Sequence, residues 1–310
     1  PPAEARPPDP HPGVTDVAFA GAGWVTTVHA LAADHAPDVR ITKVASRTPE
    51  AARARADQAG ATAVDYADLP GGADIVWVAT PPALHRREAE RAVAGGALAA
   101  VEAPLAATLE DADALVELAG QGQVAYAENL ALSPAVAEAV DACRRIGTLT
   151  HLEVRFAQGR PPGGPDRTAP AWGGGAAFDL GVHALAVAVL MAAPARVVAV
   201  EADLGTADDL EVDDDAALTL HFDTGLRALV RATWRAAAPV WEAQAASPAS
   251  AVRLELVPSP SVELNGRALR LPPPPGGLLT DQLHHLGYLP QLEALAADAR
   301  TGRAPAVGPA

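Results

Sequence analysis

The chain has 310 residues, 49% of them hydrophobic, and a formal net charge of −15. That length allows two domains, each with its own core. The negative charge argues against nucleic acid and anionic membranes as partners, because both would repel an acidic protein at long range, and the apolar runs are too short for a membrane span. We therefore expect a small-molecule partner.

The N-terminal segment, residues 1–13, is rich in proline and lacks the apolar run of a secretory signal, so we interpret it as a disordered tail. The single cysteine, Cys143, cannot form an intramolecular disulfide and falls in a helical pattern. This favours a buried structural thiol over a nucleophile, in a reducing, cytoplasmic setting. Because no Cys/His cluster has the spacing of zinc ligands, we predict no metal site.

Short apolar runs alternate with helical stretches from residue 14 onward. We expect strands at 17–20, 41–45, 75–79, 98–101 and 124–127, and helices at 24–34, 49–59, 84–94 and 109–119. Such alternation is typical of βαβ units with right-handed crossovers. It predicts an α/β Rossmann domain at 14–129, built on a parallel sheet that is covered on both faces.

The rhythm changes after residue 129, where strands follow one another with little helix between them. We expect strands at 151–156, 197–203, 216–222, 226–233, 252–257 and 261–264, helices at 134–146, 177–191 and 286–300, and a loop at 159–175. This predicts an α+β domain at 130–310, with a large, mostly antiparallel sheet covered by helices on one face. We expect Ala228, Val230 and Ala232 to line the open face, and a homodimer or homotetramer to form through it.

A glycine-rich turn follows the first predicted strand and begins the first helix, as in dinucleotide-binding proteins. Gly21 permits the tight turn, and Gly23 lets backbone amides approach a pyrophosphate. The third glycine of the motif is replaced by Thr26, so a plain strand-to-helix turn remains an alternative. Ser46 and Arg47 stand where an acidic residue would bind the ribose of NAD, which favours NADP over NAD. The alternative is a solvated arginine that stacks on adenine.

Two further strand ends belong to the same predicted site, because an open α/β sheet binds its ligand at the carboxyl ends of its strands. The third strand leads into a Thr-Pro-Pro-Ala-Leu-His segment at 80–85, and the fourth into Glu-Ala-Pro at 102–104. The residues that we predict to bind the cofactor, NADP or NAD, are Gly21, Gly23, Trp24, Val25, Ser46, Arg47, Thr80, Pro81, Leu84, His85, Glu102, Ala103 and Asn129.

Seven segments in this order resemble the glucose-fructose oxidoreductase and inositol dehydrogenase (Gfo/Idh/MocA) family. They are GAGWVTTVH, VASR, VATPPALH, VEAPLA, AENLALSP, GGGAAFDLGVH and VDDDAALTLHFDTG, spread over 14–234. The resemblance implies an NAD(P)-dependent oxidoreductase that acts on sugars or cyclitols, often as a dimer or tetramer. It also implies catalysis by the lysine of a Glu-Lys-Pro motif, which is replaced here by Ala103, together with Asp179 and His183.

Asp179 and His183 are four residues apart, so on a helix they share one face and the carboxylate can orient the imidazole for proton transfer. Their other interpretation is a first-turn aspartate and a core histidine. Because Ala103 cannot exchange a proton, we predict His183 as the proton carrier. Weaker candidates are Tyr126, Glu128 and His85. The residues that we expect to line a substrate pocket are Tyr126, Arg160, Arg167 and Trp172.

Three functions are compatible with these features. The first is an oxidoreductase without the motif lysine, acting on a sugar-like, cyclitol or other small carbonyl or imine substrate. The second is a redox-neutral enzyme that keeps NAD(H) tightly bound. The third is a catalytically silent NAD(P)-binding protein.

Overall fold

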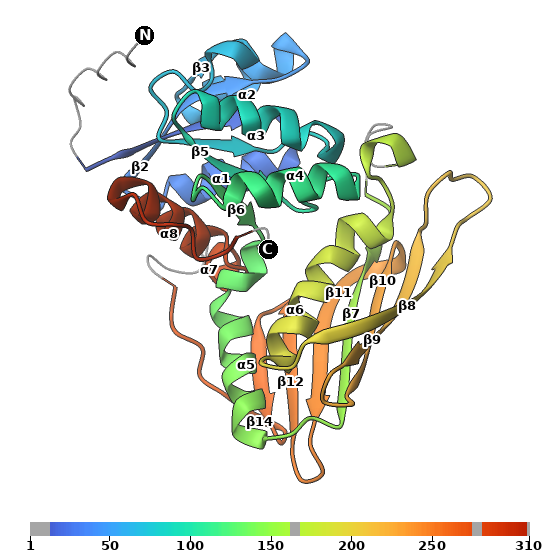
Figure 1. The fold of residues 1–310 in the computed structure, drawn as a ribbon. Coiled ribbons are helices and arrows are strands. Elements are labelled where there is room, and N and C mark those ends of the chain that lie inside the picture. The colour runs from blue at the N-terminus through green and yellow to red at the C-terminus, as the bar shows by residue number, and fades with distance from the viewer. Residues whose placement is uncertain (1–12, 162–167, 275–280, 309–310) are drawn as a thin grey trace. The chain divides into compact units, whose positions relative to one another are not determined.

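The computed structural model describes residues 13–161, 168–274 and 281–308, and it divides into two units (Figure 1). The first unit contains Pro1–Ala127 and Gln291–Ala310, and the second contains Glu128–Pro290. Residues 1–12 of the expected tail and Arg167 lie outside the described part of the chain. No helix in the described ranges is long and apolar enough to cross a membrane.

The first unit is the predicted parallel sheet with helices between its strands. Six strands lie in the order β3-β2-β1-β4-β5-β6, and every pair is parallel. This is the strand order of a dinucleotide-binding fold. The strands are β1 (Thr15–Ala20), β2 (Val39–Ala45), β3 (Thr62–Ala63), β4 (Ile75–Val78), β5 (Leu98–Glu102) and β6 (Val124–Ala127). The helices are α1 (Trp24–Ala33), α2 (Pro49–Ala59), α3 (His85–Ala94) and α4 (Leu109–Ala119), with short turns η1 (Tyr66–Asp68) and η2 (Pro82–Leu84).

Strands β1, β4, β5 and β6 of this sheet are largely buried, which explains their nearly continuous apolar sequences. Phe19 in β1 and Trp77 in β4 are fully buried. Helix α2 begins with a proline in its first turn and ends at Gly60, whose φ of 64° closes it in the left-handed conformation. The helix and strand boundaries therefore follow the local signals in the sequence.

The C-terminal segment differs from our expectation, which placed all of 130–310 in one domain. Helix α8 (Tyr288–Thr301) crosses the boundary between the units, and residues from 291 onward group with the first unit. The Thr15 hydroxyl donates to the Ala296 carbonyl at 3.4 Å and accepts from Arg300 Nη1 at 3.0 Å. An amphipathic pattern predicts a helix, but not which core the helix will cover.

The second unit contains an eight-stranded sheet in the order β14-β13-β12-β11-β7-β10-β9-β8. Strands β7 and β10 are parallel, and the other pairs are antiparallel. The strands are β7 (His151–Gly159), β8 (Val197–Gly205), β9 (Asp215–Phe222), β10 (Arg227–Thr233), β11 (Arg235–Ala246), β12 (Ala251–Val257), β13 (Ser261–Leu264) and β14 (Arg267–Ala268). The helical elements are η3 (Asn129–Leu132), α5 (Pro134–Ile146), η5 (Pro170–Trp172), η6 (Ala177–Gly181), α6 (Val182–Ala192) and α7 (Asp281–His285).

Helices α5 and α6 pack on the same face of this sheet, as predicted (Figure 1). Our assignment of the open face in β10 was wrong. Ala228, Val230 and Ala232 are at most 1% exposed and lie in the core that the helices cover. The alternate residues Arg227 and Arg231 are the exposed ones, because the apolar side of an alternating strand packs against the helices.

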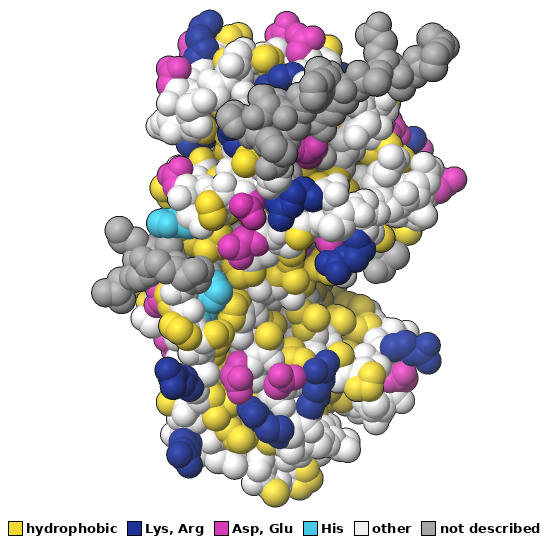
Figure 2. All heavy atoms as spheres, turned by 90° about the vertical axis from the view of Figure 1, so that its left-hand side faces the viewer, with side chains coloured by type: hydrophobic (Ala, Val, Ile, Leu, Met, Phe, Trp, Pro, Cys, Tyr) yellow, Lys and Arg dark blue, Asp and Glu magenta, His cyan; other side chains and the backbone are white. Residues whose placement is uncertain are grey.

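The open face is charged rather than apolar. Arg155 lies 3.5 Å from Glu242 on the neighbouring strand, and Arg253 lies 3.4 Å from the same carboxylate. Exposed apolar side chains are found instead on the edge strand β8, at Val197, Val198, Val200 and Leu204. On the face of the protein drawn in Figure 2, acidic and basic side chains of described residues are interspersed, so that face offers no continuous basic surface.

Candidate active site

The glycine turn lies where the carboxyl ends of three strands meet. The Gly21 amide donates to the Ala45 carbonyl at 2.8 Å, at the end of β2. Gly21 has a φ of 126°, and a Cβ on it would lie 2.4 Å from the Ala79 carbonyl oxygen, after β4. Only glycine fits both constraints.

Helix α1 begins at this turn with its first amides open to a ligand. Gly23 is its N-cap, no side chain caps the helix, and nothing lies within 4 Å of a Cβ built on Gly23. An uncapped helix N-terminus with open space above it fits a pyrophosphate group. Trp24, the first residue of the helix, is 66% exposed beside this space.

Thr80, directly after β4, offers a second feature that fits a bound dinucleotide. Its hydroxyl oxygen is buried and has no hydrogen-bond partner among the described residues. A buried hydroxyl without a protein partner is rare, and either a bound ligand or an ordered water would satisfy it. Of the other predicted cofactor residues near this strand end, Pro81 and Leu84 are half-buried in the turn that leads into α3.

His85 holds two of these loops together and is not placed for proton transfer. Its Nε2 lies 2.7 Å from the Thr80 carbonyl and its Nδ1 lies 3.1 Å from the Leu105 carbonyl. The residue is 1% exposed, and burial lowers the pKa of its imidazole. We therefore interpret His85 as a structural residue that positions the turns after β4 and β5.

Glu102, at the end of β5, lies in a buried cluster inside the first unit. Its Oε1 lies 2.5 Å from Nε2 of His29 in α1 and accepts from the Trp77 indole at 2.8 Å. These contacts join α1, which begins at the glycine turn, to β4 and β5. Glu102 thus stabilises the packing of α1 against β4. Ala103, the next residue, is half-buried. No local motif marks His29 in the sequence, because its contacts join distant segments.

Ser46 and Arg47 follow β2 at the same edge of the sheet. The Ser46 hydroxyl accepts from the Thr48 amide at 3.3 Å, and Arg47 is exposed. Lys43, the only lysine in the chain, donates to the Asp68 and Gly71 carbonyls at 2.6 Å each. The chain's lysine is therefore bound to a neighbouring loop.

His183 in α6 contacts a carboxylate that we had ranked only as a weak candidate. Its Nδ1 lies 2.8 Å from Oε2 and 3.0 Å from Oε1 of Glu128. The Glu128 side chain is 3% exposed and the His183 side chain 18% exposed. The Leu130 amide donates to Glu128 Oε1 at 3.1 Å, which fixes the carboxylate at the start of η3. The pair is a carboxylate-oriented imidazole, as general acid–base catalysis requires.

Asp179 lies in η6, a short π-helical segment directly before α6. Its Oδ2 accepts from the Trp234 indole at 3.0 Å and from the Gln158 amide at 3.3 Å. We expected Asp179 to orient His183, and the carboxylate that the structure places on Nδ1 is that of Glu128. Single π-helical turns within α-helices occur frequently at functional sites, so both predicted residues remain candidates.

Asp213 holds the start of this helical segment. Its Oδ2 accepts from the Ala177 amide at 2.7 Å, and its backbone carbonyl accepts from the Ala176 amide at 2.9 Å. A Cβ on Gly175, whose φ is 119°, would lie 2.3 Å from Asp213 Oδ1, so glycine is needed for this close approach. Burial raises the pKa of the Asp213 carboxyl. We did not predict a role for Asp213 from the sequence.

Trp241 on β11 joins the His183 ring to the sheet. Its ring stacks on Phe156 with centroids 4.8 Å apart, and it lies nearly parallel to the His183 ring at 6.4 Å. Its indole nitrogen is buried without a partner among the described residues. We did not predict a role for Trp241, because strand β11 was not expected from the sequence.

The remaining predicted residues are scattered. Asn129 is buried, and its side-chain amide donates to the Leu286 carbonyl at 2.7 Å. Tyr126 is half-buried in β6, and its backbone amide donates to Val307. Arg160 forms an exposed ion pair with Asp209 at 2.8 Å. The side chain of Trp172 lies outside the described part of the structure.

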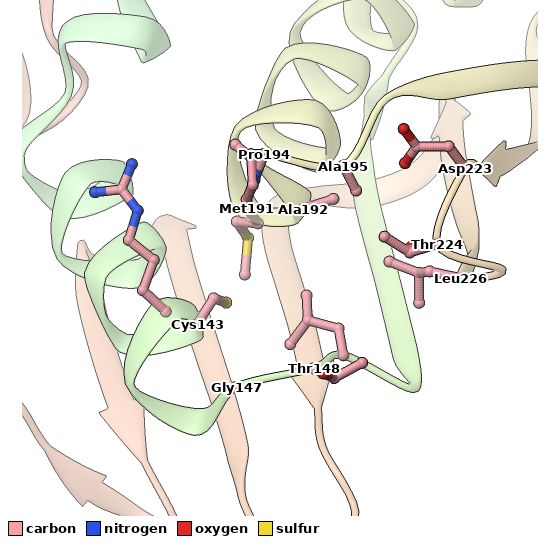
Figure 3. A pocket seen from close by; sticks show the side chains of 13 residues that line it. Cys143, Gly147, Thr148, Met191, Ala192, Pro194, Ala195, Asp223, Thr224 and Leu226 are labelled. Carbon is pink, nitrogen blue, oxygen red and sulfur yellow. The ribbon is translucent and has the colours of Figure 1, made fainter.

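A separate hollow of about 630 Å³ lies at the C-terminal ends of α5 and α6 (Figure 3). Cys143 and Met191 face it, and Asp223 and Thr224 lie on its opposite side. Burial raises the pKa of the Cys143 thiol to about 12, so the sulfur stays protonated. The predicted burial of Cys143 is confirmed.

Among the described residues, no group of three or more His, Cys, Asp and Glu side chains could hold a metal ion.

Comparison with known families agrees with this arrangement. Residues 15–130 match the oxidoreductase family with an NAD-binding Rossmann fold, and residues 135–255 match the GFO/IDH/MocA C-terminal domain. The chain therefore belongs to the Gfo/Idh/MocA oxidoreductase family. Its first unit is the NAD-binding domain of that family.

A curated relative from Streptomyces violaceoruber, dTDP-3,4-didehydro-2,6-dideoxy-alpha-D-glucose 3-reductase, is 35% identical over 165 residues. The match covers 50% of this chain and 47% of the relative, so the chain spans about half the length of that protein. Two solved structures share the fold. An oxidoreductase domain protein from Kribbella flavida is 20% identical with a TM-score of 0.82, covering 96% of this chain and 92% of that one. The WlbA dehydrogenase from Bordetella pertussis, in complex with NADH and UDP-GlcNAcA, is 18% identical with a TM-score of 0.80, covering 96% and 90%.

Proposed function

We propose that this protein is an NADP(H)-dependent reductase that converts a keto group of a nucleotide-linked sugar into a hydroxyl. The family and the names of the relatives support the reaction class and the substrate class. The observation that carries the proposal is the hydrogen bond of 2.8 Å between His183 Nδ1 and the buried Glu128 carboxylate. It supplies a proton donor in a chain that has alanine in place of the motif lysine.

The protonation step follows from this pair. Nδ1–H donates to Glu128, so we assign to Nε2 the proton exchange with the substrate oxygen. As the carbonyl carbon accepts a hydride, its oxygen gains negative charge and takes the Nε2 proton, which yields the alcohol. Bound NADPH would supply the hydride. Glu128 keeps the ring in one orientation and stabilises the imidazolium before it gives up its proton.

The choice of NADP over NAD rests on the residues after β2. A hydroxyl and a guanidinium, from Ser46 and Arg47, stand where an acidic side chain would accept hydrogen bonds from the ribose of NAD. An arginine forms charge-assisted hydrogen bonds with a 2′-phosphate, whereas it offers no acceptor to a 2′-hydroxyl.

The test is net oxidation of NADPH in the presence of a dTDP-linked keto-deoxysugar, followed through the near-ultraviolet absorbance of the reduced nicotinamide. We expect one NADPH consumed for each sugar reduced, and weaker turnover with NADH. Conversion of sugar without a net change in nicotinamide would favour the redox-neutral alternative. Tight cofactor binding without any turnover over a panel of keto-sugars would favour the silent binding protein.

We also propose that the protein assembles into a homodimer or homotetramer. The four exposed apolar side chains of β8 motivate this, because such a row on an edge strand is typical of an interface. Light scattering at micromolar concentration is expected to give a molar mass of two or four times 31.5 kDa, the mass of one chain. A Val198→Glu, Val200→Glu double variant is expected to lower the mass. A wild-type protein that stays monomeric would remove the idea.

A further inference from the structure

Arg55, in the second turn of α2, extends its side chain to the glycine turn. Its Nη2 donates to the Gly23 carbonyl at 3.4 Å, and its Nη1 donates to Gln58 Oε1 at 2.6 Å. The side chain is half-buried, and its Nε is buried without a hydrogen-bond partner among the described residues. The guanidinium therefore has an unused donor beside the predicted cofactor site.

The charge of Arg55 is also uncompensated. It forms no ion pair with a carboxylate of the described residues, whereas Arg53 in the same helix pairs with Glu50 at 2.7 Å. The chain has 38 acidic and 23 basic residues other than histidine, so carboxylates are not scarce. Burial without a counter-ion lowers the pKa of Arg55. A partly desolvated arginine without a carboxylate partner can form charge-assisted hydrogen bonds with an anionic ligand.

The surroundings of Arg55 favour an anion. Gly23 is the uncapped N-terminus of α1, which carries a partial positive charge. Ser46 and Arg47 lie at the end of β2, and α2 starts two residues later. The Arg55 guanidinium therefore contacts the first turn of α1, and Ser46 and Arg47 precede α2, the helix that carries Arg55, on the adenosine side of a dinucleotide-binding fold.

We propose that Arg55 binds the 2′-phosphate of NADP and is a specificity-determining residue for NADP against NAD. This inference rests on the proposed cofactor site and adds to it a side chain that no motif indicates. The phosphate would accept hydrogen bonds from the unpartnered Nε–H and from Nη2–H, which donates to the Gly23 carbonyl at 3.4 Å in this structure. Arg47 would bind the same group.

The test uses isothermal titration calorimetry with adenosine 2′,5′-bisphosphate and adenosine 5′-diphosphate, followed by NADP⁺ and NAD⁺. Arg55→Met is expected to weaken adenosine 2′,5′-bisphosphate and NADP⁺ by about tenfold to a hundredfold, because the charge-assisted hydrogen bonds from this guanidinium are lost. The affinities for adenosine 5′-diphosphate and NAD⁺ are expected to stay within about twofold. Arg53→Met, which removes an exposed and paired arginine from the same helix, is the matched control and is expected to change neither.

A purely structural Arg55 gives a different pattern. If Arg55→Met weakened both nucleotide pairs equally, or neither, the inference would be wrong. Thermal unfolding adds an independent readout: the ligand-free Arg55→Met protein is expected to be at least as stable as the wild type, because a half-buried charge without a carboxylate partner is removed. A less stable variant would contradict the proposal. If the wild type bound none of these nucleotides, the proposed cofactor site itself would fail.

Discussion

Replacing His183 with alanine is expected to lower kcat by roughly 10² to 10⁴, the contribution of a positioned general acid. The physical reason is that the variant loses the imidazole that the Glu128 carboxylate holds, and the chain has no lysine at position 103 to take over. The affinity for NADPH is expected to stay within about twofold, since His183 lies in the second unit and the glycine turn in the first. Steady-state kinetics and calorimetry measure the two quantities.

The control for this prediction is His151→Ala, an exposed histidine in β7 of the same unit, which is expected to leave kcat unchanged. Glu128→Gln is expected to lower kcat less than His183→Ala, because the imidazole remains but its orientation and basicity change. Its activity profile is expected to shift toward lower pH, since a neutral amide no longer stabilises the imidazolium. Full activity of His183→Ala on the substrate would rule out this proton donor.

Replacing Gly21 with alanine is expected to destabilise the first unit by about 2 to 6 kcal/mol. A side chain there must adopt a φ of 126° and would place its Cβ 2.4 Å from the Ala79 carbonyl oxygen. Backbone strain and overpacking cost about 1 to 3 kcal/mol each. Thermal unfolding measures the loss, and nucleotide binding is expected to fall with it, because the turn that presents the α1 amides is displaced.

Gly23→Ala is the matched comparison, two residues away in the same turn. Gly23 has a φ of −77°, and nothing lies within 4 Å of an added Cβ, so stability is expected to stay within about 1 kcal/mol. The new methyl would occupy the space through which a pyrophosphate approaches the helix, and NADP⁺ affinity is expected to fall at least about tenfold. Equal behaviour of the two variants, in stability and in binding, would contradict these roles of the two glycines.

The fold could be predicted where local signals and function coincide. Apolar runs predict the strands of the first unit, and the closely spaced glycines predict the turn after β1. A proline in the first turn and Gly60 at the end predict helix α2. Strand β11 could not be predicted in this way. Its sequence is rich in alanine and contains Pro239, which favour other structures. The pairing with β7 shifts register between Arg235 and Val240, and this irregularity accommodates the proline.

Only the part of the candidate site that has a local signal could be predicted from the sequence. The spacing of Asp179 and His183 is a local signal, and the two residues lie in the consecutive helical segments η6 and α6. The contact between His183 and Glu128 joins residues 55 positions apart, and the stacking of Trp241 depends on a strand that the sequence concealed. The exposed face of β10 was misassigned because alternation identifies two faces without stating which one the helices cover.

Hydride transfer by this chain without the motif lysine can be followed with NADPH that carries deuterium at its transferable position. The labelled cofactor is incubated with a dTDP-linked keto-deoxysugar, and the product is analysed by mass spectrometry. We expect one deuterium in each reduced sugar, matched by one oxidised cofactor, and loss of the labelled product in His183→Ala. Sugar conversion without deuterium incorporation, or no conversion while the cofactor stays bound, would show that the protein is not the proposed reductase.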